Sequence, residues 1–336
     1  MSDFYTLGIE TSCDDSSVAI LKNDREVLVN LISSQIDIHT LFGGVVPEIA
    51  SRKHMEAINP LIDLALKEGK LDYKDIDLIS VTKGPGLMGS LLVGISAAKG
   101  LSLALDKPMI GANHMQGHIC ANYLANEDLK PPFISLVVSG GHTYLAKVES
   151  FTDYEVVGRT LDDAVGESFD KVARKIGLGY PGGPKIDKLA KKGRADAIDF
   201  PRVMLDKNSY DFSFSGLKTA VLNYHHNLVQ KGEEVNKEDL AASFQEAVVD
   251  VLVRKSIRLL EETGYDKLAL SGGVAANSKL RERLKEELDK RGLRLYYPDI
   301  KLCTDNAAMV ALAGYLNYKN GESDDKFMKV YPNLEL

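Results

Sequence analysis

Cysteine, long apolar runs and net positive charge are all scarce in this sequence. Its 336 residues include 3 cysteines and carry a formal net charge of -7. Cys13, Cys120 and Cys303 lie far apart and form no Cys-x-x-Cys pair, which predicts reduced thiols in a cytoplasmic protein. The acidic balance argues against holding nucleic acid through bulk positive charge alone, although it leaves room for a local basic patch or a basic partner subunit.

Signals for export and membrane insertion are also missing. The N-terminal MSDFYTLGIE carries an acidic residue early and has no basic segment followed by an apolar one, so we expect no signal peptide. No stretch approaches about 18 uninterrupted apolar residues, so we expect no membrane span. With 44% hydrophobic and 26% charged residues, the composition is that of a soluble globular protein, and the length allows two domains.

The order of apolar runs and turn residues predicts a similar series of elements twice. In the first half we expect strands within 5–12, 16–23, 25–34, 75–86 and 107–114, and helices over 46–69 and 87–105. In the second half we expect strands within 131–150, 153–162 and 265–277, and helices over 163–177, 237–264 and 277–292. Three strands, a helix, a strand and a helix thus recur after about 130 residues.

This repetition predicts a duplicated α/β domain. Two lobes with mixed sheets and a cleft between them are the plan of the actin-like fold, also called ASKHA or ribonuclease H-like, although a fold alone does not give a function. We expect a first lobe in residues 1–112, with 320–336 packing back on it, and a helix and connector in 113–130. A second lobe is expected in 131–320, with an insertion at about 177–232.

Three glycine turns in the second half indicate a phosphate or nucleotide site. They are VSGGHT at 138–143, GYPGGPKID at 179–187 and LSGGVAAN at 270–277. Backbone N–H groups in such turns and at helix N-termini bind anions. The sequence has neither a P-loop nor a GxGxxG dinucleotide fingerprint. Asp170 and Asp187 lie near these turns, where a carboxylate takes ribose hydroxyls, unless the two are simply solvated helix acids.

Two histidines one helical turn apart raise the question of a metal site. The stretch NHMQGHICA at 113–121 places His114 and His118 on one helix face. A metal usually needs a third ligand, and Asp305 in CTDNAAM is a candidate, although it also suits a helix N-cap. The zinc-peptidase motif His-Glu-x-x-His is absent, because Met115 follows His114 and no acid lies between the histidines. Two ordinary histidines remain the alternative.

Acidic and basic residues elsewhere are less specific. Asp14 and Asp15 lie in the first hairpin turn, which in actin-like folds faces the cleft near the group that is transferred. The basic run at 187–194 suits a solvated helix face or a contact with RNA phosphate. The stretch DFSFSGLKTAV at 211–221 suits a packed loop that anchors the insertion.

Nine stretches, in order from about residue 5 to 320, together resemble the TsaD family of tRNA N6-adenosine threonylcarbamoyltransferases, once labelled glycoprotein endopeptidases. They are GIETSCDDSSVAIL, GGVVPEIASRKH, VTKGPGLMGSLLVG, NHMQGHICA, LVVSGGHT, TLDDAVGESFDKVARKIGLGYPGGPKID, FSFSGLKTAV, LSGGVAANSKLR and TDNAAM. One position departs from the family, whose first turn usually has Cys-Asp-Glu-Thr where this chain has Cys13-Asp14-Asp15-Ser16. The shorter acid puts a direct role for Asp15 in doubt, whereas Asp14 matches.

The resemblance implies a substrate, a metal and partners. The threonylcarbamoyl group of threonylcarbamoyl-AMP, made by a separate synthase, would pass to N6 of the adenosine next to the anticodon, position 37, in tRNAs that read ANN codons, and AMP would leave. Iron or zinc would be held by His114, His118 and Asp305. A nucleotide, with ATP or ADP as further occupants, would lie against Val137, Val138, Ser139, Gly140, Gly141, Asp170, Gly183, Asp187 and Asn277. A TsaB-like paralogue and a TsaE-like ATPase would be partners.

The chemistry of such a transfer favours positioning over a strong base. An adenine amine is a poor nucleophile, and a carbamoyl adenylate is a mixed anhydride with a good leaving group, so both must be held and the developing charge stabilised. Asp14 is the candidate for taking or relaying the amine proton. The alternatives are a metallopeptidase, which lacks its glutamate, an actin-like ATPase or kinase, and a non-catalytic scaffold.

Overall fold

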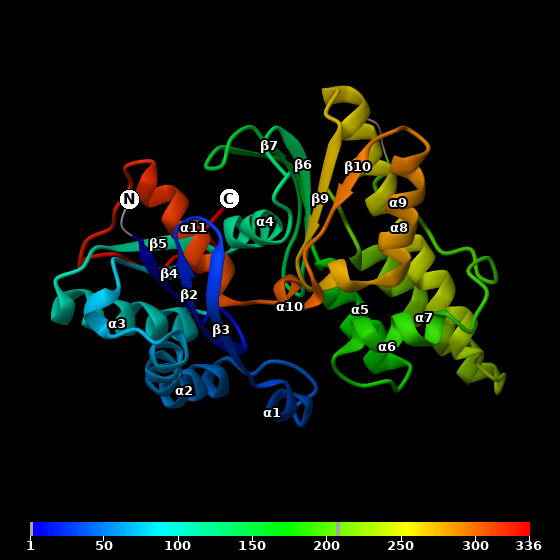
Figure 1. Cartoon of the computed structure of the whole chain (residues 1–336). Helices are drawn as coiled ribbons and strands as arrows, with labels where there is room; N and C mark the ends of the chain where they lie inside the picture. Colours follow the sequence, from blue (N-terminus) through cyan, green and yellow to red (C-terminus); the bar gives the residue numbers. More distant parts are fainter. Residues whose placement is uncertain (1–2, 206–208) are drawn as a thin grey trace. The chain divides into compact units, whose positions relative to one another are not determined.

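Two five-stranded mixed sheets form the framework of the chain (Figure 1). The structure is a computed structural model that describes residues 3–205 and 209–336. Its residues divide into two compact units, the first made of Met1–Lys130 and Pro298–Leu336 and the second of Pro131–Tyr297. Each unit holds one of the two sheets.

The sheet of the first unit has the strand order β3-β2-β1-β4-β5. Strand β1 is antiparallel to β2, and β2 to β3, whereas β1, β4 and β5 run parallel to one another. The strands are β1 (Tyr5–Glu10), β2 (Asp15–Lys22), β3 (Glu26–Ser34), β4 (Leu78–Gly84) and β5 (Met109–Asn113). The N-terminal meander and the two later strands were all predicted from the apolar pattern.

The second sheet repeats this topology strand for strand, in the order β8-β7-β6-β9-β10. Strands β6, β7 and β8 form an antiparallel meander, and β6, β9 and β10 run parallel. The strands are β6 (Phe133–Val138), β7 (Thr143–Val148), β8 (Tyr154–Arg159), β9 (Lys267–Ser271) and β10 (Arg294–Tyr296). The duplicated α/β architecture predicted from the sequence is therefore confirmed.

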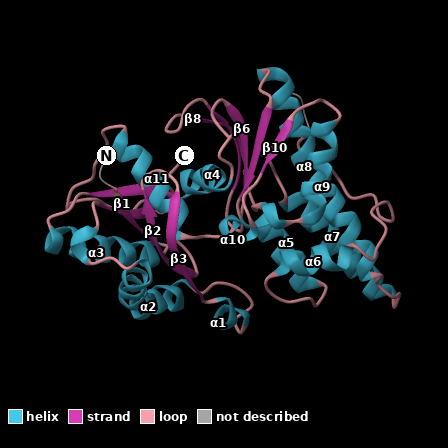
Figure 2. Cartoon of the chain, viewed as in Figure 1, coloured by secondary structure: helices cyan, strands magenta, loops and turns pink. Residues whose placement is uncertain are grey.

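Helices cover both faces of the first sheet (Figure 2). Helices α2 and α3 pack on the face that carries Leu7, Ile9 and Val81, and the core of the unit lies there. The intervening side chains point to the opposite face, where α11 packs on β1 and β4. The helices of this unit are α1 (Ile36–Thr40), α2 (Pro47–Gly69), α3 (Met88–Leu105), α4 (His114–Ala125), α10 (Ile300–Cys303) and α11 (Ala307–Lys319), with a 3-10 turn, η1, at Tyr73–Asp75.

The position of α11 corrects the predicted domain boundary. Residues 298–319 were expected in the second lobe, but they belong to the first unit. The contact is close, because a Cβ added at Gly8 of β1 would lie 2.3 Å from the Ala307 carbonyl oxygen. Small residues on both elements allow this approach, and the sequence pattern alone does not reveal which sheet they serve.

Helix α3 is, within the described residues, the one helix long and apolar enough to cross a membrane, with a mean hydropathy of 1.5 over 18 residues. Leu91, Ile95 and Ala98 of this helix are buried, and α2 and β4 pack against it. This packing gives the apolar residues of α3 a role inside the unit.

Five helices and a 3-10 turn complete the part of the second unit that the structure describes. They are α5 (Val165–Lys175), α6 (Gly182–Ala190), α7 (Ser215–Lys231), α8 (Lys237–Thr263), α9 (Ser278–Asp289) and η2 (Gly273–Ala276). The predicted insertion at 177–232 contributes α6 and α7, and its residues 206–208 lie outside the described part. Phe212 and Phe214 are buried, and the Lys255 ammonium donates to the Ser209 and Asp211 carbonyls, so residues 211–214 pack against the unit, while the rest of the stretch that was expected as a loop belongs to α7.

Candidate metal centre and nucleotide turns

Helix α4 begins where it does because Asn113 caps it. The Asn113 side-chain oxygen accepts from the N–H groups of Met115, at 2.8 Å, and Gln116, at 3.4 Å. The helix therefore starts at His114, directly after the buried strand β5. One turn later His118 lies on the same face, with the two imidazole centroids 4.7 Å apart.

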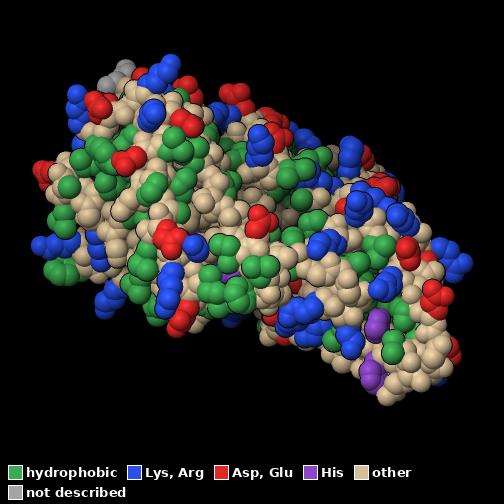
Figure 3. Space-filling model, turned by 90° about the horizontal axis from the view of Figure 1, so that it is seen from below, with side chains coloured by type: hydrophobic (Ala, Val, Ile, Leu, Met, Phe, Trp, Pro, Cys, Tyr) green, Lys and Arg blue, Asp and Glu red, His purple; other side chains and the backbone are tan. Residues whose placement is uncertain are grey.

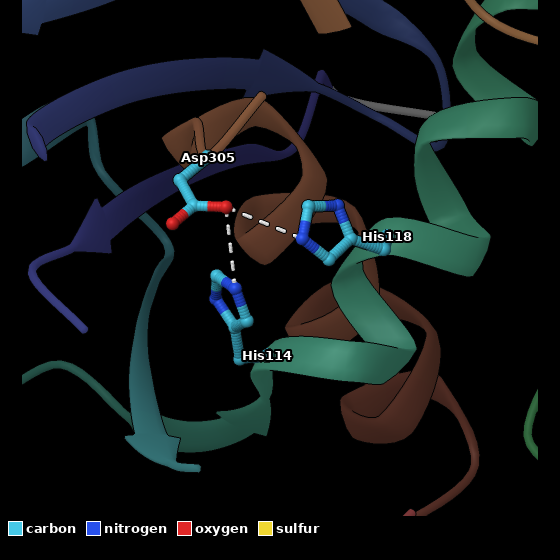
Figure 4. A group of neighbouring side chains, drawn as sticks. All are labelled: His114, His118 and Asp305. Carbon is cyan, nitrogen blue, oxygen red and sulfur yellow. Dashed lines mark ion pairs between the residues drawn. The ribbon is translucent and has the colours of Figure 1, made fainter. Parts of the chain in front are cut away.

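Asp305 reaches the two histidines from a distant part of the chain. Its Oδ1 atom lies 3.3 Å from Nε2 of His114 and 3.2 Å from Nε2 of His118 (Figure 4). The N-cap of α11 is Asn306, whose side chain accepts from Met309 N at 3.1 Å. Asp305 is therefore not needed as a helix cap, and its carboxylate is left to face the histidines.

The electrostatics of this group depend on burial and on mutual attraction. His118 has no exposed surface and His114 is 5% exposed. Burial lowers the pKa of His118, which favours the neutral imidazole that a metal requires. Burial also disfavours the charged forms of His114 and Asp305. The charges of Asp305 and Glu10 nevertheless hold the pKa of His114 well above its usual value, and His114 holds the pKa of Asp305 well below its usual value.

The donor set fits a divalent transition metal. The one nitrogen or oxygen that each of His114, His118 and Asp305 offers lies within 4.8 Å of the others. Although Nε2 of His118 is fully buried and close to Asp305, the contact lacks hydrogen-bond geometry, and a bound cation would give this nitrogen a partner. Two imidazole nitrogens and one carboxylate oxygen suit zinc or iron and leave further positions for substrate or water.

A fourth residue, Glu10 at the end of β1, was missed by the sequence analysis. Its Oε2 atom lies 2.9 Å from Nδ1 of His114, on the side of the ring opposite Asp305. The only sequence signal was an acid at the end of an otherwise apolar strand. Such a residue is usually a polar strand end, and its burial could not be foreseen.

The turn that carries Asp14 and Asp15 is tied to helix α2. His54 of that helix donates from Nε2 to the Cys13 carbonyl at 2.9 Å, and its Nδ1 accepts from Ser16 Oγ at 2.7 Å. Burial raises the pKa of Asp14, and it raises the pKa of Asp15 to about 7. The charge of Asp305 adds to both effects, so the turn lies within electrostatic range of the metal group.

Two glycine turns of the second unit lie side by side. The turn after β6 is closed by Ser139, which exchanges backbone and side-chain hydrogen bonds with His142. The turn after β9 packs on it, because a Cβ at Gly272, where φ is 86°, would lie 2.3 Å from the Val138 carbonyl oxygen. The amide of Gly166, near the start of α5, donates to the Ser139 carbonyl at 3.2 Å, so a helix N-terminus adjoins both turns.

The other predicted nucleotide residues lie on the neighbouring helices, with Asp170 inside α5, Gly183 and Asp187 in α6, and Asn277 at the N-cap of α9. Asp170 accepts from the Gly182 amide at 2.6 Å and thereby fixes the start of α6. Asp187 accepts from Ser278 Oγ at 2.9 Å, and Asn277 donates to Gln245 at 2.8 Å. Asp170 is thus partly occupied by a structural hydrogen bond, whereas Gly183, Gly140 and Gly141 have open space where a side chain would be.

A cavity of about 480 Å³ adjoins this cluster. The residues that contact Asp187 and Asn277, namely Lys191, Gln245 and Ser278, line it. Its volume is in the range of small-molecule sites.

Two of the four basic side chains in the run at 187–194 form ion pairs. Lys191 pairs with Asp187 at 3.7 Å and Arg194 with Asp196 at 3.9 Å. On the face drawn in Figure 3, Lys and Arg side chains are interspersed with Asp and Glu.

Comparison with known proteins places the chain in a family. The model of the TsaD family, described as tRNA N6-adenosine threonylcarbamoyltransferase, matches residues 26–312. A protein of that name from Clostridioides difficile (strain 630) is 54% identical over 336 residues, which cover 100% of this chain and 99% of the relative. Another from Clostridium perfringens (strain ATCC 13124) is 56% identical over 330 residues, covering 98% and 97%.

Solved structures show the fold. The crystal structure of T. kodakarensis HypF matches with a TM-score of 0.65 and 16% identity over 95% of this chain, which spans 48% of that HypF chain. Component A of the Acidaminococcus fermentans (R)-2-hydroxyglutaryl-CoA dehydratase matches with a TM-score of 0.55 and 16% identity, covering 94% of this chain and 99% of that one. Such distant likeness supports the actin-like fold and nothing finer. Because the family model and the relatives match nearly the whole chain, it belongs to the TsaD family.

Proposed function

We propose that this chain transfers the threonylcarbamoyl group of threonylcarbamoyl-AMP to N6 of the adenosine at position 37, next to the anticodon, in tRNAs that read ANN codons. AMP is the second product. The observation that carries the proposal is the full-length identity of 54% to a relative named tRNA N6-adenosine threonylcarbamoyltransferase. The His-His-Asp group in one unit and the clustered glycine turns in the other supply the kinds of site that this reaction needs.

In this proposal His114, His118 and Asp305 hold one divalent ion, Fe²⁺ or Zn²⁺. When bound there, such an ion supplies Lewis-acid polarisation and an anchor for substrate oxygens. The short contacts of both Nε2 atoms with one carboxylate oxygen and the burial of the histidines support this assignment. The donor atoms alone do not distinguish iron from zinc.

The second unit binds the adenylate in this proposal. Phosphate lies against the stretch Val137, Val138, Ser139, Gly140 and Gly141, where Gly140 and Gly141 leave open space beside the backbone. The amides of Ser139 and of the first residues of α5 already donate within the protein, so the glycine amides are the donors assigned to the anion. Asp187 and Asn277, whose hydrogen-bond partners Ser278 and Gln245 line the cavity of about 480 Å³, hold the ribose and adenine. Gly183 leaves space for close approach, and Asp170 orients the start of α6.

Asp14 takes the proton that the adenine amine loses on transfer. Its burial raises its pKa, which makes the Asp14 carboxylate a stronger base than an exposed one. Burial also raises the pKa of Asp15, to about 7. Measuring transfer by Asp14→Asn and Asp15→Asn separately shows which of the two carboxylates accepts the proton. Holding the two substrates in a reactive geometry supplies most of the catalysis, because the adenine amine is a weak nucleophile and AMP is a good leaving group.

The partners in this proposal are tRNA, a TsaB-like paralogue and a TsaE-like ATPase, with a threonylcarbamoyl-AMP synthase upstream, and the chain acts in the cytoplasm. The decisive experiment mixes the metal-loaded chain with both partners, synthetic threonylcarbamoyl-AMP and unmodified tRNA, and measures modified nucleoside by mass spectrometry. We expect product with the wild type and none with His114→Ala. His226→Ala removes an exposed histidine on α7 and serves as the matched control, with normal product.

Other outcomes contradict the proposal. If the wild type forms no modified nucleoside under these conditions, the assigned reaction is wrong. ATP turnover that needs neither tRNA nor partners and is unchanged in His114→Ala supports an actin-like ATPase. Proteolysis that survives purification and disappears in His114→Ala supports a peptidase.

A further inference from the structure

Glu10 is a carboxylate with no exposed surface at the end of an apolar strand. An ionised acid at such a depth is costly unless hydrogen bonds replace its water. Three donors do so here. The Ser12 amide donates to Oε1, while Thr82 Oγ1, at 2.6 Å, and His114 Nδ1, at 2.9 Å, meet at Oε2.

The fold builds this arrangement from three separate segments. Strands β1 and β4 run parallel with Ile9 opposite Val81, so the next pair places Glu10 beside Thr82. His114 comes from α4, whose start is set by the Asn113 cap. Both carboxylate oxygens thus accept hydrogen bonds, Oε1 from the Ser12 amide and Oε2 from Thr82 and His114.

The two ring nitrogens of His114 consequently face different groups. Nδ1 faces Glu10, and Nε2 faces Asp305 at 3.3 Å. An imidazole that donates from Nδ1 to a carboxylate presents the Nε2 lone pair to the opposite side. His118 differs, because its buried Nδ1 has no hydrogen-bond partner in the described part of the chain.

We propose that Glu10 is a positioning residue that holds His114 in the Nδ1–H tautomer and turns its Nε2 toward the metal, with Thr82 fixing the carboxylate. This inference rests on the proposed metal site. It means that the ring of His114 is held in one orientation by a hydrogen bond at Nδ1, whereas the ring of His118 is not. Ser12 Oγ lies 3.2 Å from the same Nδ1 and is the alternative hydrogen-bond partner of His114, so a Ser12 variant is tested separately.

The test measures Zn²⁺ binding to the purified full chain, stripped of metal, by competition with a chromophoric chelator. Glu10→Gln puts an NH₂ group, which donates, where the carboxylate accepts three hydrogen bonds. We therefore expect the affinity for Zn²⁺ to fall about 10- to 100-fold. Thr82→Val leaves Glu10 charged but less constrained, so its effect should be smaller and in the same direction. Ser12→Ala should change the affinity less than twofold if Glu10 is the partner that matters.

Two matched controls come from the same unit. Asp324→Asn makes the same carboxylate-to-amide change at a residue whose Oδ2 accepts from the Gly111 amide at 2.9 Å. Ser80→Ala removes a buried β4 hydroxyl that donates to the Val310 carbonyl at 2.7 Å. Both should bind Zn²⁺ within twofold of the wild type, because neither contacts Glu10 or His114 in the described residues.

A second readout does not depend on the variants folding. Imidazole ¹⁵N shifts of the Zn²⁺-loaded wild type should show His114 protonated at Nδ1 and metal-bound at Nε2. Metal bound at Nδ1 overturns the inference, and so does a Glu10→Gln variant that binds Zn²⁺ within twofold of wild type. If the wild type binds no Zn²⁺ or Fe²⁺ at all, the proposed metal site is wrong and this inference fails with it. Metal binding without tRNA modification refutes only the proposed reaction.

Discussion

Replacing Gly314 in α11 with alanine should destabilise the first unit, although alanine is the better helix former. A Cβ at this position would lie 2.1 Å from Ser80 Oγ and 2.5 Å from Ser80 Cβ. Ser80 cannot turn away without loss, because its hydroxyl donates to the Val310 carbonyl of the same helix at 2.7 Å. The substitution must therefore push α11 off β4 or break this buried hydrogen bond.

The magnitude follows from three contributions. Overpacking a close contact costs about 1–3 kcal/mol. Losing the Ser80 hydrogen bond costs about 1 kcal/mol. Replacing glycine by alanine inside a helix contributes about 1 kcal/mol in the opposite direction. We therefore expect Gly314→Ala to lower the free energy of unfolding by about 1–3 kcal/mol.

Gly100→Ala is the matched control. Gly100 lies inside α3 of the same unit, and a Cβ added there would meet nothing within 4 Å. Only the helix-propensity gain remains, so this variant should be more stable than wild type by about 1 kcal/mol. Urea unfolding followed by circular dichroism, with equal slopes for the three proteins, measures both differences. If Gly314→Ala is as stable as Gly100→Ala, α11 is not seated on β4 as described.

Three further predictions concern the proposed sites. Asp305→Ala removes the carboxylate that both Nε2 atoms face, so Zn²⁺ affinity should fall by more than about 100-fold in the chelator assay. This loss is larger than the one expected for Glu10→Gln, because Asp305 is a proposed ligand and Glu10 contacts only a ligand. Burial raises the pKa of Asp15 to about 7, so its contribution to stability is present below its ordinary value of 3.8 and is lost as the pH rises through 7. As the pH rises from 4 to 8, the free energy of unfolding of Asp15→Asn should therefore increase relative to that of the wild type, by at most about 4 kcal/mol in urea unfolding. A difference that stays constant with pH would contradict this pKa. Asp187→Ala should weaken AMP binding about 10-fold in calorimetry, while Asp196→Ala, an exposed acid, should not change it.

Much of the fold was predictable because the period of apolar residues changes with the type of element. Strands β1 and β6 are apolar runs that end in small polar turns, and the same series of elements follows each. The assignment of residues 298–319 was wrong for a physical reason. Helix α11 is buried along most of its length, and an apolar pattern without a polar face does not identify the sheet on which it packs.

The metal group was only partly predictable from residue spacing. His114 and His118 are neighbours on any helix, so their pairing follows from local geometry. Asp305 is brought to them by the return of the chain through α10 and α11, which no local pattern encodes. The sequence offered Asp305 only as a candidate, and the resemblance to a family assigned it as the third ligand. Glu10 was missed because its role depends on a parallel strand pair and on a helix cap, both of which are tertiary facts.

The surroundings of Glu10 also decide what the histidine pair does not do. A peptidase helix carries a glutamate directly after its first histidine, and that glutamate takes a proton from the metal-bound water. Here that position is Met115, which is fully buried. Glu10 is the acid that contacts His114 from outside the proposed ligand set, but its Oε1 accepts from the Ser12 amide and its Oε2 from Thr82 and His114. A carboxylate with both oxygens engaged and no exposed surface does not accept a proton from water at the metal. The acid beside the histidine pair therefore orients a ligand and does not activate water, which favours a site that positions a substrate for transfer over one that hydrolyses a peptide.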